Sequence, residues 1–437
     1  MVFHRPVVLI VGAGVGGLTT ALALRRAGFS AFVVDNQRVL SQGKRVGVPL
    51  WSHALRVLDR LGVGVQLRML ALPTLKCEIL SVGKNQNAKH RTLASISLSE
   101  YSQNTTAEAL VVDRAELQHS LLEALPPNTV WTDCRFVSMQ AVGESLSPNE
   151  RNTVSSDDSP PLRVKLMFGD GNERELDCAL VIGADGKRSL VRGYINHRAV
   201  WRSAGFTQWQ GVVDIDPQLH GPTSTFPMFT AREFWGAGDR FGFMTMSPGR
   251  VYWYATCNTR KGQVFLRPFK KHLESRFGGF PVVCSQLLQA CVENEIERND
   301  AYVLDRAMDV SLPVIGERIA LVGNAGYPAT SNFHQQTCMA IEDAFTLAQC
   351  IGKFGLKDSL ALEMYNAARM KRSRLIAKFG AQQLSTIAQW ERPWLVKTRN
   401  SLLTLAATHS LLRNQLTRLG VYEAGSLPLS RPYSFAF

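Results

Sequence analysis

A continuous apolar run lies near the start of the chain, at residues 7–11. It contains several β-branched side chains and no polar residue, which is typical of a parallel strand covered on both faces. A helical segment follows over 18–26 and ends near Gly28, where a glycine can take the left-handed conformation that closes a helix. A second apolar run covers 29–34. Together these segments predict a β-α-β unit of about 30 residues.

Helical spacing of leucines predicts a second helix over 51–62. Asp113 and Glu116 precede another leucine-rich segment and form the sequence signature of a capping box. Gly169–Asn172 indicates a hairpin turn. Further strands are predicted at 72–98, 130–139, 162–168, 173–177, 179–182 and 319–323, and further helices at 340–350 and 360–383.

The middle of the chain changes character twice. Residues 143–161 lack aromatic side chains and are rich in Ser, Pro, Asn and Asp, so we expect an exposed loop there. Aromatic residues are then dense over 200–315, and the alternation at 251–255 predicts an antiparallel sheet. These aromatic side chains could form either a hydrophobic core or the wall of a cavity.

Length and cysteine content narrow the classes of protein. A chain of 437 residues predicts two or three domains at roughly 150 residues each. Eight cysteines without a C-x-x-C pair predict a reducing compartment and no structural zinc. The glycines within 12–17 argue against a signal peptide, and no apolar run is long enough for a transmembrane helix. We therefore expect a cytoplasmic protein.

The formal net charge of +13 is concentrated near the C-terminus, where residues 365–420 hold ten basic residues against the single acid Glu391. Trp390, Trp394 and several leucines accompany this charge. An amphipathic helix that touches an anionic membrane would have this pattern, and so would a core-packing helix with a solvated basic face. Nucleic-acid binding is not expected, because no recognised module accompanies the charge.

The glycine-rich turn after the first strand carries candidate chemistry. Gly12 permits a tight turn, Gly14 lets a pyrophosphate approach the backbone, and Gly17 lets the helix pack close to the strand. Asp35 lies 21 residues after Gly14, at the end of the second strand, where an acid can hold ribose hydroxyls. The pattern predicts a dinucleotide site, but it does not distinguish FAD from NAD(P).

Several ordered motifs give the chain a resemblance to a known family. It resembles the FAD-dependent aromatic-ring hydroxylases, the single-component flavoprotein monooxygenases of the para-hydroxybenzoate hydroxylase type. The segments that carry the resemblance are GAGVGG with Asp35, RVGV running into HALRVLDRLGV, DRAEL, LVIGADGKRSLVR, and RIALVGNAGYP followed by AIEDAFTLA. RFGFMTMSPGRVYWYAT is similar to the middle-domain strands of that family.

The resemblance implies an α/β fold in which a Rossmann-like FAD-binding domain with a β-meander is interleaved with a smaller antiparallel-sheet substrate domain and followed by C-terminal helices. The expected FAD-binding domain is discontinuous. Its segments would be 1–75, 105–195 and 315–375, the substrate domain would take 76–104 and 196–314, and the C-terminal helical segment would take 376–437.

The resemblance also implies roles for individual residues. Asp35 would take the adenosine ribose, and Arg114 would lie near the pyrophosphate. Asp185 belongs to a motif associated with FAD and with transient NAD(P)H binding. The other implied cofactor contacts are Gly12, Gly14, Gly17, Arg45, Gly47, Gly323, Asn324, Pro328 and Thr337. By composition alone, Arg45 and Arg114 could equally be solvated surface residues, and Asp185 could belong to an ordinary turn.

The second flavin motif departs from the family pattern. Asn324 replaces the usual Asp and Tyr327 replaces a His, while His334 and Gln336 occupy positions where the family has glycines. These side chains add bulk and remove free access to positive φ. Two explanations stay open at this point: a remodelled but working flavin pocket, or a family member without redox chemistry.

The resemblance thus predicts an FAD-dependent, NAD(P)H-consuming monooxygenase that uses O2 to hydroxylate or epoxidise a hydrophobic aromatic or polyene molecule. No catalytic residue and no metal site can be assigned from the motifs. The alternatives are a nucleotide-binding scaffold without oxygenase activity, and a cofactor-assisted isomerase or cyclase.

Overall fold

The computed structural model describes most of the chain. It covers residues 7–408, except 41–43, 84–89, 99–108, 143–161, 196–200, 220–225, 261, 305–317, 328–334 and 377–384, together with residue 424. The expected loop at 143–161 therefore lies outside the described residues.

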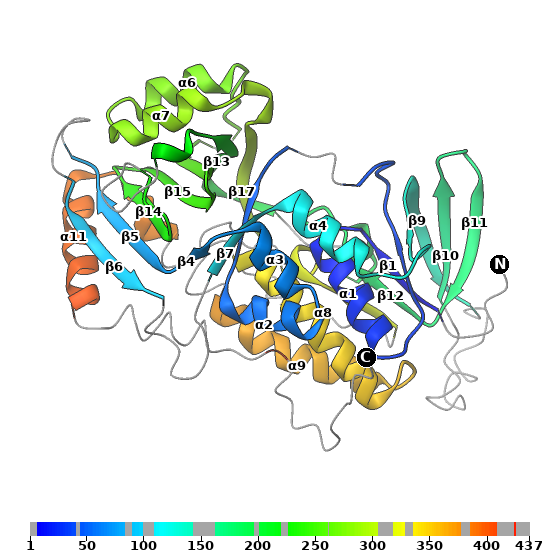
Figure 1. Ribbon diagram of the computed structural model, residues 1–437. Helices are drawn as coiled ribbons and strands as arrows, with labels where there is room; N and C mark the ends of the chain where they lie inside the picture. Colours follow the sequence, from blue (N-terminus) through cyan, green and yellow to red (C-terminus); the bar gives the residue numbers. More distant parts are fainter. Residues whose placement is uncertain are drawn as a thin grey trace.

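A five-stranded parallel sheet forms the centre of the larger part of the molecule (Figure 1). Its strand order is β18 (Ile319–Leu321), β12 (Leu180–Gly183), β1 (Val8–Val11), β2 (Ala31–Val34) and β8 (Val130–Trp131). All four residues of β1 are buried, as expected of an apolar strand with both faces covered.

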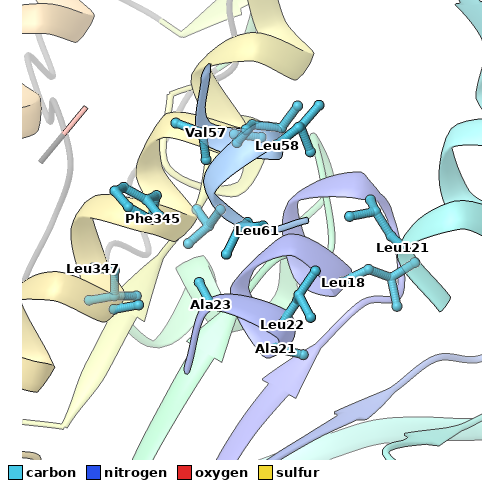
Figure 2. Packing of buried hydrophobic residues seen from close by; sticks show 14 of the residues in the cluster. Leu18, Ala21, Leu22, Ala23, Val57, Leu58, Leu61, Leu121, Phe345 and Leu347 are labelled. Carbon is cyan, nitrogen blue, oxygen red and sulfur yellow. The ribbon is translucent and has the colours of Figure 1, made fainter. Parts of the chain in front are cut away.

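Helices cover one face of this sheet. Val8 and Ile10 pack in one core with α1 (Val15–Arg26), α2 (Ser52–Arg60) and α8 (Gln335–Phe354). Figure 2 shows side chains of α1, α2 and α8 converging in this core, with Leu121 of α4 (Arg114–Glu123) at its side. The alternate residues of β1, Leu9 and Val11, face the opposite direction.

A β-meander covers the other face. Its strands are β9 (Cys134–Ala141), β10 (Leu162–Phe168) and β11 (Glu173–Cys178), which are antiparallel neighbours. Leu9 and Val11 share a core with side chains of this meander, including Phe136 and Val164. The predicted strand over 130–139 is in fact two strands, because Asp133 takes a positive φ of 52° between β8 and β9.

A seven-stranded sheet forms the second part of the molecule. Its order is β17 (Glu297–Leu304), β13 (Trp201–Asp214), β16 (Arg250–Asn258), β15 (Asp239–Ser247), β14 (Thr230–Trp235), β5 (Lys76–Ser81) and β6 (Thr92–Ser97). Most neighbours are antiparallel, but β14 and β5 are parallel. Two helices, α6 (Phe269–Phe277) and α7 (Val282–Ala290), pack against one face (Figure 1).

A small sheet and several helices complete the arrangement. The small sheet has the order β3 (Gly47–Leu50), β7 (Ala109–Asp113) and β4 (Pro73–Thr74). The remaining α-helices of the described residues are α3 (Gly64–Leu70), α5 (Leu190–Ile195), α9 (Ser359–Ile376), α10 (Ser385–Ala388) and α11 (Pro393–Thr408). In Figure 1, α11 lies alongside β6, at the end of the seven-stranded sheet.

The predicted β-α-β unit, the hairpin at Gly169–Asn172 and the capping box of Asp113 and Glu116 are confirmed. The α/β fold class is confirmed as well. The helix predicted over 360–383 is described as α9, to Ile376 only. The boundaries proposed for the domains stay a prediction. All eight cysteines are free thiols, and among the described helices none is long and apolar enough to cross a bilayer.

Candidate active site

The glycine-rich turn lies at the carboxyl end of β1. Gly12 has a φ of 105°, and a Cβ at Gly17 would overlap the carbonyl oxygen of Gly12, so both positions require glycine. A Cβ at Gly14, by contrast, would meet no atom within 4 Å. Gly14 also begins α1 without a side-chain cap. The open N-terminus of α1 therefore presents backbone N–H groups to an incoming phosphate.

Asp35 follows β2, beside this turn. Its carboxylate accepts hydrogen bonds from the backbone N–H of Ala13 at 2.7 Å and of Gln37 at 2.9 Å. The side chain thus ties the end of β2 to the glycine turn. This is the position that an acid at a ribose would occupy, but the ribose contact itself stays a prediction.

A cleft lies where the parallel sheet meets the seven-stranded sheet, and we call it the inner cleft. Four of the predicted cofactor residues line it together: Gly47, Arg114, Asn324 and Thr337. Its other lining residues are Val46, Val48, Pro49, Lys187, Gln208, Gln210, Glu297, Asn299, Asp300, Ala301, Tyr302 and Gln336. Gln336 stands on the wall of this cleft without closing it.

Gly47 is required by close packing. A Cβ at this position would overlap the ring of Tyr252, so β3 can lie on the seven-stranded sheet only with a glycine there. Arg114 begins α4, and its guanidinium lies 3.4 Å from Glu297 across the inner cleft. Gly47 of β3 and Arg114 of α4 thus come from different elements and line the same cleft.

The structure places two other predicted residues in protein contacts. Arg45 donates to Asp214 through both terminal nitrogens, at 2.7 and 3.0 Å, and this hydrogen bond raises the pKa of Arg45. Asp185 accepts the backbone N–H of Leu190 at 2.7 Å and thereby caps α5. Its Oδ1 is buried and has no hydrogen-bond partner in the described part of the chain. The flavin contacts expected of both residues stay predictions.

Asp343 of α8 holds the second flavin motif in place through hydrogen bonds. Gly323 has a φ of 60°, and its backbone N–H donates to Oδ2 of Asp343 at 2.8 Å. The hydroxyl of Tyr327 donates to the same oxygen, so Tyr327 is directed toward α8. Pro328 and His334 lie outside the described residues. Asn324 therefore faces the inner cleft on a turn that Asp343 fixes.

Asp343 belongs to a group of buried ionisable side chains that the sequence analysis missed, and we call this group the buried charge cluster. It consists of His53, Glu342, Asp343, Arg369 and Arg372. Arg369 donates to Asp343 at 2.5 Å and to Glu342 at 2.7 Å. Arg372 donates to Glu342 at 3.0 Å, and Nδ1 of His53 lies 2.7 Å from the same carboxylate.

Burial and neighbouring charge oppose each other in this cluster. Burial disfavours the ionised form of Glu342, but Arg369, Arg372 and His53 outweigh it and hold the pKa of Glu342 well below its ordinary value of 4.5. Burial lowers the pKa of His53 below 6.5, and Glu342 only partly offsets this effect. The signal in the sequence was an adjacent Glu and Asp within an otherwise apolar helix.

A second, mainly apolar space adjoins the inner cleft, and we call it the apolar cavity. Pro49 and Gln208 belong to the lining of both spaces. Its other lining residues are Trp51, Thr74, Cys77, Glu78, Ile79, Ile96, Leu98, Ala109, Val111, Ala231, Arg232, Glu233, Trp235, Arg240, Met244, Tyr254, Thr256 and Ala388.

The aromatic residues of the seven-stranded sheet divide between its two faces. Trp209, Phe241 and Trp253 pack in a core beneath α6 and α7. Trp235 and Tyr254 line the apolar cavity on the other side. Both interpretations of the aromatic segment are therefore correct for different residues, and most of the large side chains belong to the core.

Comparisons with known proteins agree with this geometry. A family model described as an FAD binding domain matches residues 5–278. The chain is 29% identical over 407 residues to an aurachin C monooxygenase/isomerase of Stigmatella aurantiaca, covering 92% of this chain and 94% of that protein. It is 29% identical to a 2-heptyl-3-hydroxy-4(1H)-quinolone synthase of Pseudomonas aeruginosa, covering 93% and 96%.

A solved structure shows the same fold. Klebsiella pneumoniae HpxO in complex with FAD and uric acid superimposes with a TM-score of 0.77 at 22% sequence identity, covering 96% of this chain and 97% of HpxO. This likeness concerns the arrangement of the elements, which agrees over nearly the whole length of both chains.

Proposed function

Because the chain belongs to the FAD binding domain family and is an FAD-dependent monooxygenase, we propose that it oxygenates a fused aromatic N-heterocycle of the 4-quinolone type that carries an apolar chain. The observation that carries this proposal is the apolar cavity, which adjoins the inner cleft through Pro49 and Gln208. Such a cavity accommodates an aromatic ring and an alkyl or alkenyl chain better than a small polar heterocycle.

The residues present fit FAD at both ends of the molecule. Gly14 leaves open space at the N-terminus of α1, where the pyrophosphate would be held, and Asp35 would take the adenosine ribose. At the other end, Asn324 and Thr337 line the inner cleft that would receive the ring system. We propose the same cofactor role for Gly12, Gly17, Arg45, Asp185, Gly323 and Pro328.

FAD, when bound and reduced by NAD(P)H, activates O2 for transfer of one oxygen atom to the substrate. The balance is one substrate C–H, O2, NAD(P)H and a proton giving C–OH, water and NAD(P)⁺. The chain itself supplies position and exclusion of water. At the boundary of the two spaces, Gln208 and Tyr252 both donate to the carbonyl oxygen of the Gln210 side chain, at 3.0 and 2.8 Å, which fixes these groups.

The test is oxygenation by the purified protein loaded with FAD. We expect the flavin absorbance to bleach with NADH or NADPH without air and to return with air. With 2-heptyl-4(1H)-quinolone and ¹⁸O2, the product should gain one labelled oxygen atom, whereas urate should give none. Failure to take up FAD, or flavin turnover that yields only peroxide with the quinolone, would contradict the proposal.

A cavity-filling variant links the activity to the apolar cavity. Ala231 lines the cavity, so Ala231→Phe should raise KM for the quinolone strongly while leaving FAD binding intact. Ala290 is exposed at the end of α7, and Ala290→Phe serves as the matched control. Equal KM values for the two variants would place the substrate elsewhere.

A second proposal concerns the surface of α11. Arg399 and Leu403 are buried, whereas Trp394, Leu402 and Leu405 are 61%, 52% and 54% exposed. The exposed lysine Lys397 lies on the same helix. We propose that this face of α11 touches an anionic membrane surface, from which an apolar substrate would enter the adjacent cavity.

Vesicle flotation tests the membrane contact. The protein should float with phosphatidylglycerol vesicles, and the double variant Trp394→Ser/Leu405→Ser should stay in the bulk phase. Met69 is 84% exposed on α3, so Met69→Ser is the control and should float like the parent chain. Flotation of the double variant at the parent level would exclude α11 as the contact surface.

A further inference from the structure

We propose that Glu233 accepts a hydrogen bond from an N–H or O–H group of the substrate inside the apolar cavity. This inference rests on the proposed function and adds the polar feature that the substrate must carry. Apolar lining alone would hold any hydrophobic molecule of suitable size, so the polar groups within the cavity decide orientation and selectivity.

Two carboxylates line the cavity, and their hydrogen bonding differs. Glu78 has both oxygens occupied, one by Lys76 at 2.6 Å and the other by Arg232 at 2.8 Å. Glu233 receives a hydrogen bond from Arg240 at 3.0 Å on Oε1. Its second oxygen, Oε2, accepts no hydrogen bond from the residues that the structure describes. Of the two, Glu233 is the one with an oxygen that carries no hydrogen bond from the described residues.

Arg240 fixes Glu233 in place. Its side chain is nearly buried, with 6% exposure, and its Nε is within hydrogen-bond distance of Thr256 at 3.2 Å and of Gln389 at 3.3 Å. A guanidinium held on several sides keeps the paired carboxylate in one orientation. Because Arg240 already balances the charge of Glu233, the remaining oxygen suits a neutral donor.

The sheet register shows where this acceptor lies. Four residues lie directly opposite one another across neighbouring strands: Gln210 on β13, Tyr254 on β16, Gly242 on β15 and Glu233 on β14. Three strand spacings of about 4.8 Å separate Gln210 from Glu233, or about 14 Å. Gln210 lines the inner cleft, whereas Glu233 lines the apolar cavity.

Tyr254 lies between these two positions. A Cβ at Gly242 would overlap the ring of Tyr254, so the tyrosine ring lies across Gly242, in the direction of β14. An aromatic surface thus leads from the inner cleft toward a carboxylate. A flat substrate ring placed on this surface can bring a donor at its edge, or a donor on its chain, to Oε2 of Glu233.

Two groups of a quinolone-type substrate have the required chemistry: the ring N–H and a hydroxyl on the apolar chain. The experiment compares 2-heptyl-4(1H)-quinolone with its N-methyl derivative, and with its 7-hydroxyheptyl derivative. Dissociation constants are measured on the FAD-loaded protein by quenching of tryptophan fluorescence, because Trp235 lines the cavity. Values of kcat/KM for the same compounds are measured in parallel.

The test variant is Glu233→Met/Arg240→Met, which removes both charges together and leaves no unpaired ion. Two preferences are compared: that for the N–H quinolone over its N-methyl derivative, and that for the 7-hydroxyheptyl derivative over the parent quinolone. We expect the double variant to reduce one of them by about 10- to 100-fold, as for a lost hydrogen bond to a charged group. A loss confined to the N–H pair identifies the ring group, and a loss confined to the hydroxyl pair identifies the chain group. Asp59→Met/Arg68→Met removes an ion pair whose residues line neither space, so it is the control and should leave both preferences unchanged.

Both preferences remaining at the parent level in the double variant would overturn the inference. The binding measurement does not depend on turnover, so it separates this inference from the proposed function. If donor selectivity depends on Glu233 but no oxygenated product forms, the inference stands and the proposed reaction is wrong. If product forms and selectivity does not depend on Glu233, the reverse holds.

Discussion

Replacement of Arg369 by methionine tests the energetic role of the buried charge cluster. Arg369 is fully buried and donates to two carboxylates, Asp343 at 2.5 Å and Glu342 at 2.7 Å. Methionine is of similar length and apolar, so packing is largely retained. What is lost is the cation, which leaves two buried carboxylates with Arg372 as the remaining arginine of the cluster.

The expected cost follows from this imbalance. Removal of one partner from a buried ion pair destabilises a protein by about 3–5 kcal/mol, because an uncompensated charge stays behind. Arg68 provides the comparison. It also forms a two-point pair, with Asp59 at 2.5 and 3.0 Å, but both side chains are at least one-third exposed. Such a pair contributes about 0.2–1 kcal/mol.

The assay is urea-induced unfolding followed by tryptophan fluorescence, with the free energy of unfolding compared among the parent chain, Arg369→Met and Arg68→Met. We expect Arg369→Met to lower the free energy of unfolding by at least about 2 kcal/mol more than Arg68→Met does, because loss of the buried pair costs about 3–5 kcal/mol. The affinity for FAD should fall as well, because Asp343 also holds the N–H of Gly323. Equal losses in both variants would refute the reasoning.

Three further predictions concern single residues. Because burial lowers the pKa of His53, the unfolded chain binds a proton below pH 6.5 that the folded chain does not, so stability should fall from pH 6.5 downward by up to about 1.4 kcal/mol per pH unit. Unfolding curves of His53→Gln should show a weaker fall, and an identical slope would contradict this. Gly14→Val should abolish FAD retention on gel filtration by filling the open space at α1, whereas retained flavin would exclude that site. Gly242→Ala should displace the Tyr254 ring and raise KM more than kcat changes, and unaltered kinetics would argue against Tyr254 as part of the cavity.

The glycine turn was predictable because its requirements are local. Gly12 needs a positive φ, and Gly17 lies against the carbonyl of Gly12 only five residues away. Both requirements depend on backbone geometry within a single turn, so the spacing of glycines in the sequence is sufficient to reveal them. The acid at the end of the following strand is fixed by the same β-α-β geometry, and Asp35 lies beside the turn accordingly.

The second flavin motif was harder to interpret because its side chains depend on distant partners. From the sequence, the bulk of Tyr327 and Gln336 was expected to reduce the space for the flavin ring. In the structure Tyr327 donates to Asp343 instead, and Gln336 forms part of the cleft wall. Asp343 is in turn held by Arg369, which lies on another helix. The open cleft and the family membership favour the remodelled pocket over the loss of redox chemistry.

The apolar cavity shows what alternation can and cannot reveal. Period-2 alternation places Trp209 and its aromatic neighbours on one face of the sheet, and Gln208 and Gln210 on the other. The sequence does not say which face meets the cofactor, because that depends on how β3 packs across Tyr252. Once the aromatic face is covered by α6 and α7, the opposite face is the one left for the substrate. The selectivity of the enzyme should therefore depend on the few polar residues that interrupt this second face. Among them is Glu233, whose Oε2 accepts no hydrogen bond from the residues that the structure describes.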